Sequence, residues 1–391
     1  MGCFLPGSFR RLHAASLGRH PYLQNVARER AILRWTTQEA CEGEVLISRD
    51  DSTWSVPAQV TEFTPSQTGL PSVFYQHHAD ISGLSEATGY AYSCLGDGAA
   101  LTADGLPGFR TAGPGACEFL ALGDSGAGSP EQERLAELMS RQSAAFVIHT
   151  GDVVYPVGSF EAYDLRHFRI YRDLMARAPF FPSLGNHDVA EDGGAAYLAS
   201  HALPAEGVPA SDQGFYYSFD WGQAHLISID SNRLLAEGRR LTRMLEWLEE
   251  DLSATRQAWR IVYFHHTPYA SGPHEASVDS LAARKRLVPV FERHGVQLVL
   301  AGHEHSYQRS WWIKNGDHST RPENGVLYVT TGGGGGGLYE APARPFLAMT
   351  ASVHHYVRVE VRAERLEIRA IDLDGREIDS VTCERSSAAN G

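Results

Sequence analysis

The sequence predicts an all-β sandwich followed by a larger α/β domain. Short strand-like runs separated by turn residues fill residues 28–111, and a Gly/Pro-rich break, "AGPGA", follows at 112–116. Apolar strands and helical patterns then alternate, which is typical of α/β proteins. At 391 residues the chain is long enough for both domains. We expect an N-terminal extension over 1–19, the β-sandwich over 20–112 and the α/β domain over 117–385.

The N-terminal region resembles a fibronectin type III-like domain. The resemblance rests on Trp35, the segments "ISGL", "TGYAY" and "FRT", and a tyrosine at the corner position, Tyr90 or Tyr92. A packing or spacer module is therefore expected here. His77 and His78 lie in a strand-like run, and we interpret them as ordinary strand residues.

The composition is that of a folded protein with an acidic balance. Hydrophobic residues make up 43% and charged residues 21% of the chain, which is ordinary for a globular protein. The formal charge of −13, from 34 basic and 47 acidic side chains, provides no general positive field. We therefore expect no nucleic-acid partner. A phosphate-containing substrate would need local positive charge, for which metal ions are the obvious source.

The sequence contains neither a membrane span nor a complete export signal. No apolar run approaches the roughly 18 to 20 residues that cross a bilayer. Residues 1–20 carry three arginines but no continuous apolar segment and no small-residue cleavage pattern, so at most they are the remnant of a secretory signal. Pro6 stands where N-myristoylation requires Ser or Thr, which argues against that modification.

The cysteines lack the spacing of a metal-binding motif. None belongs to a CxxC pair, so we do not expect them to be ligands. Cys41 and Cys94 lie at the edges of two strand-like runs, where a disulfide and two free thiols are both open interpretations. The five cysteines are Cys3, Cys41, Cys94, Cys117 and Cys383.

Five short segments end predicted strands with side chains that can bind metal. α/β proteins place their sites just after strand ends. Each segment alone is weak evidence for a metal site, because a lone "GD" or "GNH" is most often a turn. Together they place Asp, Asn and His at successive strand ends, which predicts a metal site. The segments are "GDSG" with Asp124, "GDVVY" with Asp152 and Tyr155, "GNHD" with Asn186 and His187, "VYFHH" with His265, and "GHEH" with His303 and His305.

These five segments match, in order and type, the signature of the metallophosphoesterase superfamily. Tyr155, three residues after Asp152, makes the chain resemble purple acid phosphatases in particular, and "GHEHSYQR" also fits. The resemblance covers residues 118–310. It implies a four-layer αββα sandwich, preceded by the β-sandwich that such enzymes commonly carry. The six-glycine run over 332–337 is expected to form a tight loop near the site.

The resemblance also implies two metal ions that share Asp152. A shared carboxylate keeps two cations at the roughly 3.5–4 Å that suits one phosphoryl group. Iron is expected in the first site, because a phenolate ligand favours a trivalent ion, and iron, zinc or manganese in the second. The implied ligands of the first ion are Asp124, Asp152, Tyr155 and His305; those of the second are Asp152, Asn186, His265 and His303.

By the same resemblance the chain hydrolyses phosphate monoesters through attack of a metal-bound hydroxide. His187 is expected to bind phosphate or to protonate the leaving alkoxide from outside the metal shell. His274 is its expected partner, although an exposed loop histidine is an equal alternative. A small phosphate ester is the expected substrate, and relatives with this domain pair suggest an extracytoplasmic (secreted or periplasmic) location.

The roles of several neighbouring residues are open. Either His265 or His266 could bind the second ion, and the spacing of the family motif favours His265. Asp188 is expected to orient His187 or to cap the following loop. We interpret His149 as structural, since it lies inside an apolar strand. His354 and His355 lie in a C-terminal strand and are not expected to be catalytic.

Two other functions compete with monoester hydrolysis. A phosphodiesterase of the same superfamily would share the metals and differ in the pocket. A non-catalytic extracellular binding protein would keep the metal domain as a relic, but no ligand position has been lost, which argues against decay.

Overall fold

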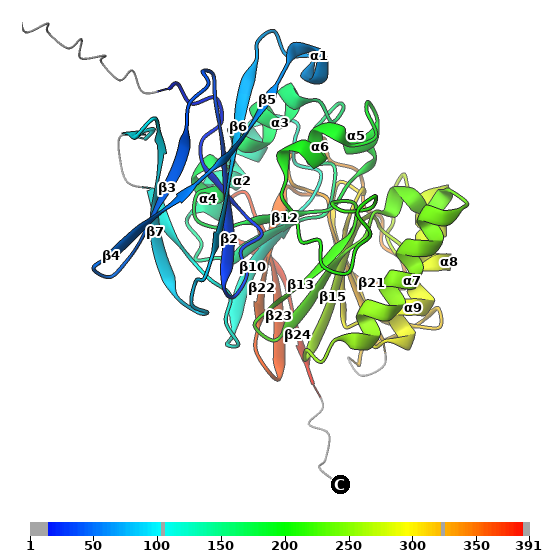
Figure 1. Ribbon diagram of the computed structural model, residues 1–391. Coiled ribbons are helices and arrows are strands. Elements are labelled where there is room, and N and C mark those ends of the chain that lie inside the picture. Colours follow the sequence, from blue (N-terminus) through cyan, green and yellow to red (C-terminus); the bar gives the residue numbers. More distant parts are fainter. Residues whose placement is uncertain (1–14, 103–105, 322–324, 386–391) are drawn as a thin grey trace, which may run out of the picture.

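The computed structural model describes residues 15–102, 106–321 and 325–385, and these form two parts (Figure 1). The N-terminal part is an antiparallel sandwich, with a short helix, α1 (Pro65–Thr68), joining β5 to β6. The all-β prediction is therefore confirmed. One sheet has the order β1 (Tyr22–Gln24), β2 (Arg30–Thr37), β6 (Phe74–Ser82), β5 (Gln59–Phe63); the other has β4 (Ser52–Pro57), β3 (Gly43–Arg49), β7 (Gly89–Gly96), β8 (Ala99–Ala100), with β9 (Leu106–Arg110) also paired to β7.

The two candidate corner tyrosines have different roles. Tyr90 accepts a hydrogen bond at its hydroxyl from the backbone N–H of Ser85, five residues upstream (2.7 Å), as a tyrosine corner does. Tyr92 instead donates its hydroxyl proton to the carbonyl of Ala176 in the α/β domain (2.6 Å). Tyr90 is therefore the corner residue, while Tyr92 joins the two parts.

His77 and His78 lie in β6 and make structural contacts. The ring of His77 stacks on Trp35 with 4.8 Å between centroids, and its Nε2 lies 2.9 Å from the hydroxyl of Thr37. Burial lowers the pKa of His77 to about 4, so its ring is neutral. His78 accepts a hydrogen bond from Arg34 (3.0 Å).

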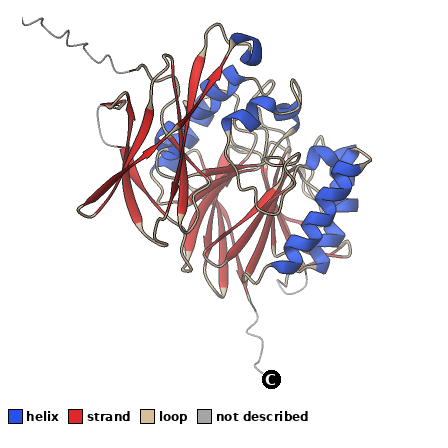
Figure 2. Cartoon of the chain, in the orientation of Figure 1, coloured by secondary structure: helices blue, strands red, loops and turns tan. Residues whose placement is uncertain are grey.

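The second part contains two sheets that pack face to face, with helices on the outside (Figure 2). This is the expected four-layer αββα sandwich. The six-stranded sheet has the order β12 (Phe180–Pro182), β11 (Phe146–His149), β10 (Cys117–Leu122), β22 (His355–Val361), β23 (Arg365–Asp372), β24 (Glu377–Glu384). The seven-stranded sheet has β13 (Tyr217–Trp221), β14 (Ala224–Ser228), β15 (Trp259–His266), β16 (Leu298–Gly302), β20 (Leu327–Thr331), β17 (Tyr307–Ser310), β21 (Leu347–Ala351).

Helices cover the outer faces of both sheets. Buried side chains of α2 (Pro130–Ser140) and α4 (Arg172–Met175) pack with the six-stranded sheet. Those of α7 (Arg239–Ala254), α8 (Val278–Arg286) and α9 (Val288–Arg293) pack with the seven-stranded sheet, as Figure 1 shows. The remaining elements are α3 (Phe160–Tyr163), α5 (Asn186–Val189), α6 (Ala195–Ser200), a π-helical turn (Asp164–Phe168), a 3₁₀ turn (Ser231–Leu235), β18 (Trp312–Lys314) and β19 (Asp317–Ser319).

The local sequence explains the elements that carry the site. β10 and β11 are parallel and buried on both faces, which is why they read as near-continuous apolar runs. Between them, α2 begins after Ser129, whose side chain accepts from the N–H of Gln132 (3.2 Å), with Pro130 in the first turn. The helix α2 therefore carries the chain back across the sheet, so that β10 and β11 begin at the same edge.

Polar contacts hold the sandwich against the α/β domain. Arg19 is 4% exposed and forms an ion pair with Asp164 of the π-helical turn (2.5 Å). Tyr22 donates to the carbonyl of Ser200 (2.9 Å), and Arg34 donates to that of Ala199 (2.9 Å). Because these partners are buried or half-buried backbone and carboxylate groups, they fix the orientation of the two parts.

The described cysteines are all free thiols. Cys41, Cys94, Cys117 and Cys383 form no disulfide, so the open question about Cys41 and Cys94 is answered in favour of thiols; Cys3 and Pro6 lie outside the described residues. Within the described ranges, no helix combines the length and apolar character that crossing a membrane requires.

Candidate metal centre

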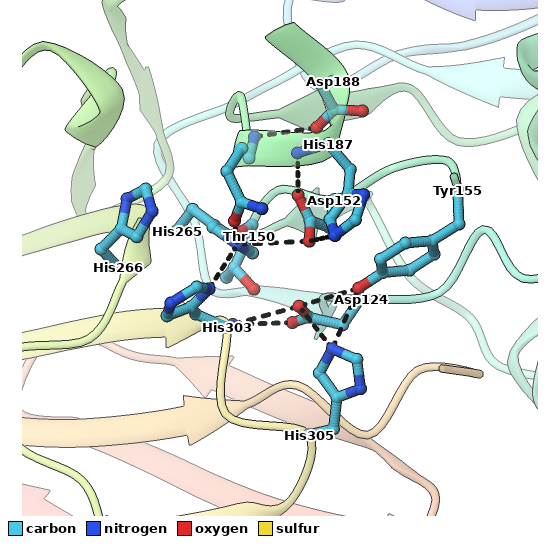
Figure 3. A network of polar contacts seen from close by, with 12 residues as sticks. Asp124, Thr150, Asp152, Tyr155, His187, Asp188, His265, His266, His303 and His305 are labelled. Atoms are coloured by element: carbon cyan, nitrogen blue, oxygen red, sulfur yellow. Dashed lines mark hydrogen bonds and ion pairs between the residues drawn. The ribbon is translucent and has the colours of Figure 1, made fainter. Parts of the chain in front are cut away.

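The predicted ligand segments meet at one edge of the two sheets. Asp124, Asp152 and Asn186 follow the carboxyl ends of β10, β11 and β12, while His265 ends β15 and His303 follows β16. Figure 3 shows the side chains of His265, His303, Tyr155 and His305 converging around Asp124 and Asp152. In α/β proteins, sites lie beyond the carboxyl ends of the strands. Here the segments at those ends come from both sheets.

Three of these residues have left-handed backbone conformations. The φ angles are 56° at Asp124, 50° at Asp152 and 72° at His303. Such conformations cost of order 1–3 kcal/mol each for residues other than glycine and are concentrated at functional sites. Here they turn the chain sharply off each strand and aim the side chain at the common centre.

Glycines allow the loops to approach one another closely. A Cβ at Gly185 would lie 2.1 Å from the backbone nitrogen and Oδ1 of Asp152. In the six-glycine run, a Cβ at Gly332 would lie 2.3 Å from the carbonyl oxygen of Glu304, and one at Gly336 would lie 2.9 Å from the ring of His305. The prediction that this run forms a tight loop near the site is confirmed.

The first group of ligand atoms comes from Asp124, Tyr155 and His305. The Tyr155 hydroxyl lies 3.2 Å from Asp124 Oδ1 and 3.0 Å from His305 Nε2. His305 Nε2 is in turn 3.3 Å from Asp124 Oδ1. His305 donates its Nδ1 proton to the carbonyl of Gly337 (2.7 Å), which leaves Nε2 free to bind a metal.

The second group surrounds His265. Its Nε2 lies 2.9 Å from Asn186 Oδ1, 3.2 Å from His303 Nδ1 and 3.4 Å from Asp152 Oδ2. His265 Nδ1 donates to the carbonyl of Thr150 (3.1 Å), so the tautomer again leaves Nε2 available. Asp152 is 2% exposed and lies beside this group, where a carboxylate can be shared between two ions.

The charges at the centre suit a cation. Burial opposes ionisation of Asp152, but His265 and His187 lower the pKa of its carboxyl to about 2. Burial also favours neutral His265, yet Asp152 and Asp124 raise the pKa of its ring to about 9. A metal ion can replace the proton that the carboxylates attract, and an oxygen and imidazole donor set suits iron, zinc and manganese.

His266 lies beside the second group. His265, His266 and His303 have ring nitrogens close enough together to hold an ion. However, His266 Nδ1 lies 2.8 Å from the hydroxyl of Ser231, and Figure 3 shows its ring to one side of the converging residues. The contacts to Asn186 and Asp152 come from His265, so the geometry favours His265 as the ligand.

The two predicted outer histidines both lie at the rim. His187 Nδ1 donates to the carbonyl of Pro156 (2.6 Å), its Nε2 lies 3.9 Å from Asp152 Oδ2, and its side chain is 38% exposed. The ring of His274 packs on His303 with 4.0 Å between centroids. His274 is therefore not a remote loop histidine.

Asp188 forms hydrogen bonds to the loops that contain Gly185 and Val153, and it does not orient His187. Its carboxylate accepts hydrogen bonds from the N–H of Gly185 (2.8 Å), the N–H of Val153 (3.1 Å) and the hydroxyl of Tyr163 (2.8 Å). Burial, and then the charge of Asp152, raise the pKa of Asp188 to about 7. Both N–H donors precede Asp188 in the chain, so neither expected role, orienting His187 or capping the following loop, is observed.

The remaining predicted structural histidines stay outside both groups. His149 lies in β11, with its Nε2 2.8 Å from the hydroxyl of Ser125. His354 Nδ1 donates to the carbonyl of Gly333 (3.2 Å), and buried His355 donates to that of Val353 (3.0 Å). The last two therefore support the glycine loop.

Two residues near the site were missed by sequence reasoning. Glu304 is fully buried between His303 and His305, and a charged residue inside "GHEH" was a signal that could have identified it. Tyr339 stacks on His305 with 4.3 Å between centroids and 7° between planes. Nothing in the sequence around Tyr339 indicates this contact, because a glycine-rich loop brings the ring there.

Comparison with known proteins agrees with this geometry. The calcineurin-like phosphoesterase family matches residues 118–307. The chain is 28% identical to acid phosphatase type 7 of Homo sapiens over 387 residues, covering 89% of this chain and 86% of the relative. It is 27% identical to purple acid phosphatase 18 of Arabidopsis thaliana, covering 66% of this chain and 58% of the relative. A purple acid phosphatase from yellow lupin (Lupinus luteus) seeds shares the fold, with a TM-score of 0.82, 19% identity, and coverage of 95% of this chain and 75% of that chain.

The αββα fold with paired ligand groups at its strand ends is that of a metallophosphoesterase, and residues 118–307 form a calcineurin-like phosphoesterase domain. The chain is a purple acid phosphatase-like metallophosphoesterase with an N-terminal fibronectin type III-like domain. The family implies a dinuclear metal site, and the described residues contain candidate ligands for it.

Proposed function

We propose that this enzyme hydrolyses phosphate monoesters at a dinuclear metal centre. The observation that carries the proposal is the convergence of six ligand-type side chains, in two groups of three, next to the carboxylate of Asp152. The names of the relatives, acid phosphatase type 7 and purple acid phosphatase 18, support a monoester as the substrate. The proposed ligands are Asp124, Asp152, Tyr155 and His305 for the first ion, and Asp152, Asn186, His265 and His303 for the second.

The donor set also supports a choice of metals. When bound, two such ions would neutralise the phosphoryl oxygens and lower the pKa of a water so that its hydroxide attacks phosphorus. Tyr155 offers a hard, charged phenolate oxygen, so we assign iron to the first site. Asn186 offers a neutral oxygen to the second site, for which iron, zinc or manganese is suitable.

The chain's own residues handle the leaving group. His187 is held at Nδ1 by the Pro156 carbonyl, so its Nε2 is available at the rim. There it can bind a phosphoryl oxygen or donate a proton to the departing alkoxide. His274, packed on His303, lies at the same rim and can provide a second contact to the phosphate.

A pair of chromogenic substrates tests the proposal. Metal-loaded protein should cleave p-nitrophenyl phosphate faster than bis(p-nitrophenyl) phosphate, and Asp152→Ala should cleave neither. Faster cleavage of the diester would identify a phosphodiesterase of the same family. No cleavage of either substrate by protein that holds two metals per chain would contradict hydrolysis and favour a binding protein.

We also propose that the enzyme works outside the cytoplasm, as resemblance to exported enzymes with this domain pair suggests. Activity that stays with the cytoplasmic fraction of cells expressing the chain from its own gene would contradict this.

A further inference from the structure

Glu304 is a buried carboxylate whose side-chain contacts are with the loop that carries His274. It stands between His303 and His305 and is 0% exposed. Its Oε1 accepts a hydrogen bond from the backbone N–H of His274 (2.5 Å), and the ring of His274 is its ion-pair partner within the described residues, at 3.6 Å from Nδ1. Its Oε2 has no hydrogen-bond partner there.

An unsatisfied donor lies next to this unsatisfied acceptor. His274 Nδ1 is also buried and makes no hydrogen bond within the described part of the chain. Buried polar groups nearly always have partners. Because the carboxylate and the ring nitrogen are 3.6 Å apart at Oε1, a small rotation of either side chain pairs them.

The surrounding contacts restrict His274 to this place. Its ring packs on His303 at 4.0 Å and lies 5.6 Å from Tyr339. The loop before it passes directly over the carboxylate, since a Cβ at Gly272 would lie 2.6 Å from Glu304 Oε2. The side chain of His274 is still 29% exposed. One ring nitrogen therefore lies beside Glu304, and the partial exposure of the ring leaves the other able to meet a ligand.

We infer that Glu304 is a positioning residue, which holds the loop and the ring of His274 so that His274 Nε2 contacts the phosphoryl group of the substrate. The backbone N–H of His274 donates to this carboxylate and its ring nitrogen lies 3.6 Å from it, so one carboxylate contacts both the loop and the ring. This inference rests on the proposed function for the identity of the ligand. It assigns a role in phosphate contact to the central residue of "GHEH", distinct from the metal-binding role of the two histidines around it.

Four single variants separate positioning from other roles. Glu304→Gln keeps an oxygen that accepts the hydrogen bond from the His274 backbone and can face the ring, so it should stay within about threefold of the native kcat/KM. Glu304→Ala removes the acceptor and should lower kcat/KM about as much as His274→Ala does, mainly through a higher KM. Glu340→Ala is the matched control, since Glu340 is exposed on the neighbouring loop, and it should leave KM unchanged.

The double variant Glu304→Ala/His274→Ala tests whether Glu304 acts through His274. If it does, the double variant should be no worse than His274→Ala alone. Elemental analysis should find the same metal content in all variants. Additive losses, loss of metal in Glu304→Ala, or a Glu304→Gln variant as impaired as Glu304→Ala would each overturn the inference.

Two further readouts do not depend on turnover. Inorganic phosphate should bind metal-loaded native protein and Glu304→Gln equally, and Glu304→Ala more weakly, by calorimetry. A crystal structure of Glu304→Ala should show the His274 ring displaced from His303. If native protein binds phosphate but hydrolyses no monoester, the proposed function fails while the positioning role is supported. A ring that stays in place, together with unchanged phosphate binding, would overturn the positioning role.

Discussion

Two groups of buried histidines lie close together in the α/β domain and have opposite character. At the metal centre, burial favours neutral rings, but Asp124 and Asp152 more than offset it and raise the pKa values of His265 and His305. In β11 and the helical layer behind it, burial lowers the pKa values of His149 and His201 to about 3. His149 precedes Asp152 by only three residues.

His149, His167 and His201 lie among aromatic rings, whereas the histidines of the metal centre lie beside carboxylates. The centroids of His149 and His167 are 6.0 Å apart, and those of His167 and His201 are 5.8 Å apart. Tyr163 and Phe168 pack against His167, and both of its ring nitrogens lack a partner within the described residues. Burial lowers the pKa of His167 well below its ordinary value. The comparison teaches that carboxylates beside buried histidines distinguish the metal centre, even though burial and the neighbouring histidines lower the pKa of His303 within it.

The most damaging change should be Asp152→Ala, which removes the carboxylate that both ions share. We expect loss of both metals and of about 10⁴-fold or more in rate, because the ions supply the nucleophile and neutralise the phosphate, each worth several kcal/mol. His201→Gln, in the other group, should keep two metals per chain. Elemental analysis and rates with p-nitrophenyl phosphate check this. An Asp152→Ala variant with two metals and a near-normal rate would refute the shared-ligand assignment.

The next largest effect is expected for His187→Ala. His187 lies outside both ligand groups, so this variant should keep its metals but lose roughly 10²–10⁴-fold in rate, the range of general acid–base catalysis. The loss should shrink for esters with good leaving groups, which need no proton. Equal loss across leaving groups would indicate phosphate binding instead, and loss of metal would refute a role outside the metal shell.

His149 and His201 should lower the free energy of unfolding at acidic pH. Below pH about 6.5 the unfolded chain protonates His149 and His201, whereas the folded chain keeps them neutral until pH about 3. Stability should therefore fall with falling pH across this window, by up to about 1.4 kcal/mol per pH unit for each histidine. Urea unfolding at several pH values should show a shallower pH dependence for His201→Gln. The exposed His318→Gln serves as the control, and an unchanged slope in His201→Gln would contradict the account.

The smallest effect on rate is expected for Tyr155→Phe. Its hydroxyl lies 3.0 Å from His305 Nε2 and 3.2 Å from Asp124 Oδ1, where a phenolate would bind ferric iron. Native protein loaded with iron should show a visible phenolate-to-iron band, and Tyr155→Phe should lose the band but keep the second ion. We expect a loss of about tenfold in rate, corresponding to about 1.4 kcal/mol. A colourless iron-loaded native protein, or a band that survives the substitution, would mean that Tyr155 only packs at the mouth of the site.

The sequence points to several of the proposed ligands because Asp124, Asp152, Asn186 and His303 each follow a glycine just after a buried strand. The choice between His265 and His266 is different, since neighbouring strand residues normally point to opposite faces. Here β15 has a register irregularity between Phe264 and His266 opposite β16, so strand alternation does not determine which ring faces the centre. Family register and the three-dimensional contacts both favour His265.

Contacts between distant segments could not be predicted from the sequence. The partnership of Glu304 with His274 spans 30 residues, and it depends on how closely Gly272 passes over the carboxylate. The stacking of Tyr339 on His305 depends on the path of the glycine run. Neither contact leaves a periodic pattern, because loops position both partners.

The central claim is that two ions share Asp152, and anomalous diffraction from crystals of metal-loaded protein tests it most directly. We predict two peaks roughly 3.5–4 Å apart. One should lie among Asp124, Tyr155 and His305, and the other among Asn186, His265 and His303, with Asp152 contacting both. A single peak, or a second peak bound by His266 and not by Asn186, would contradict the assignment of this centre.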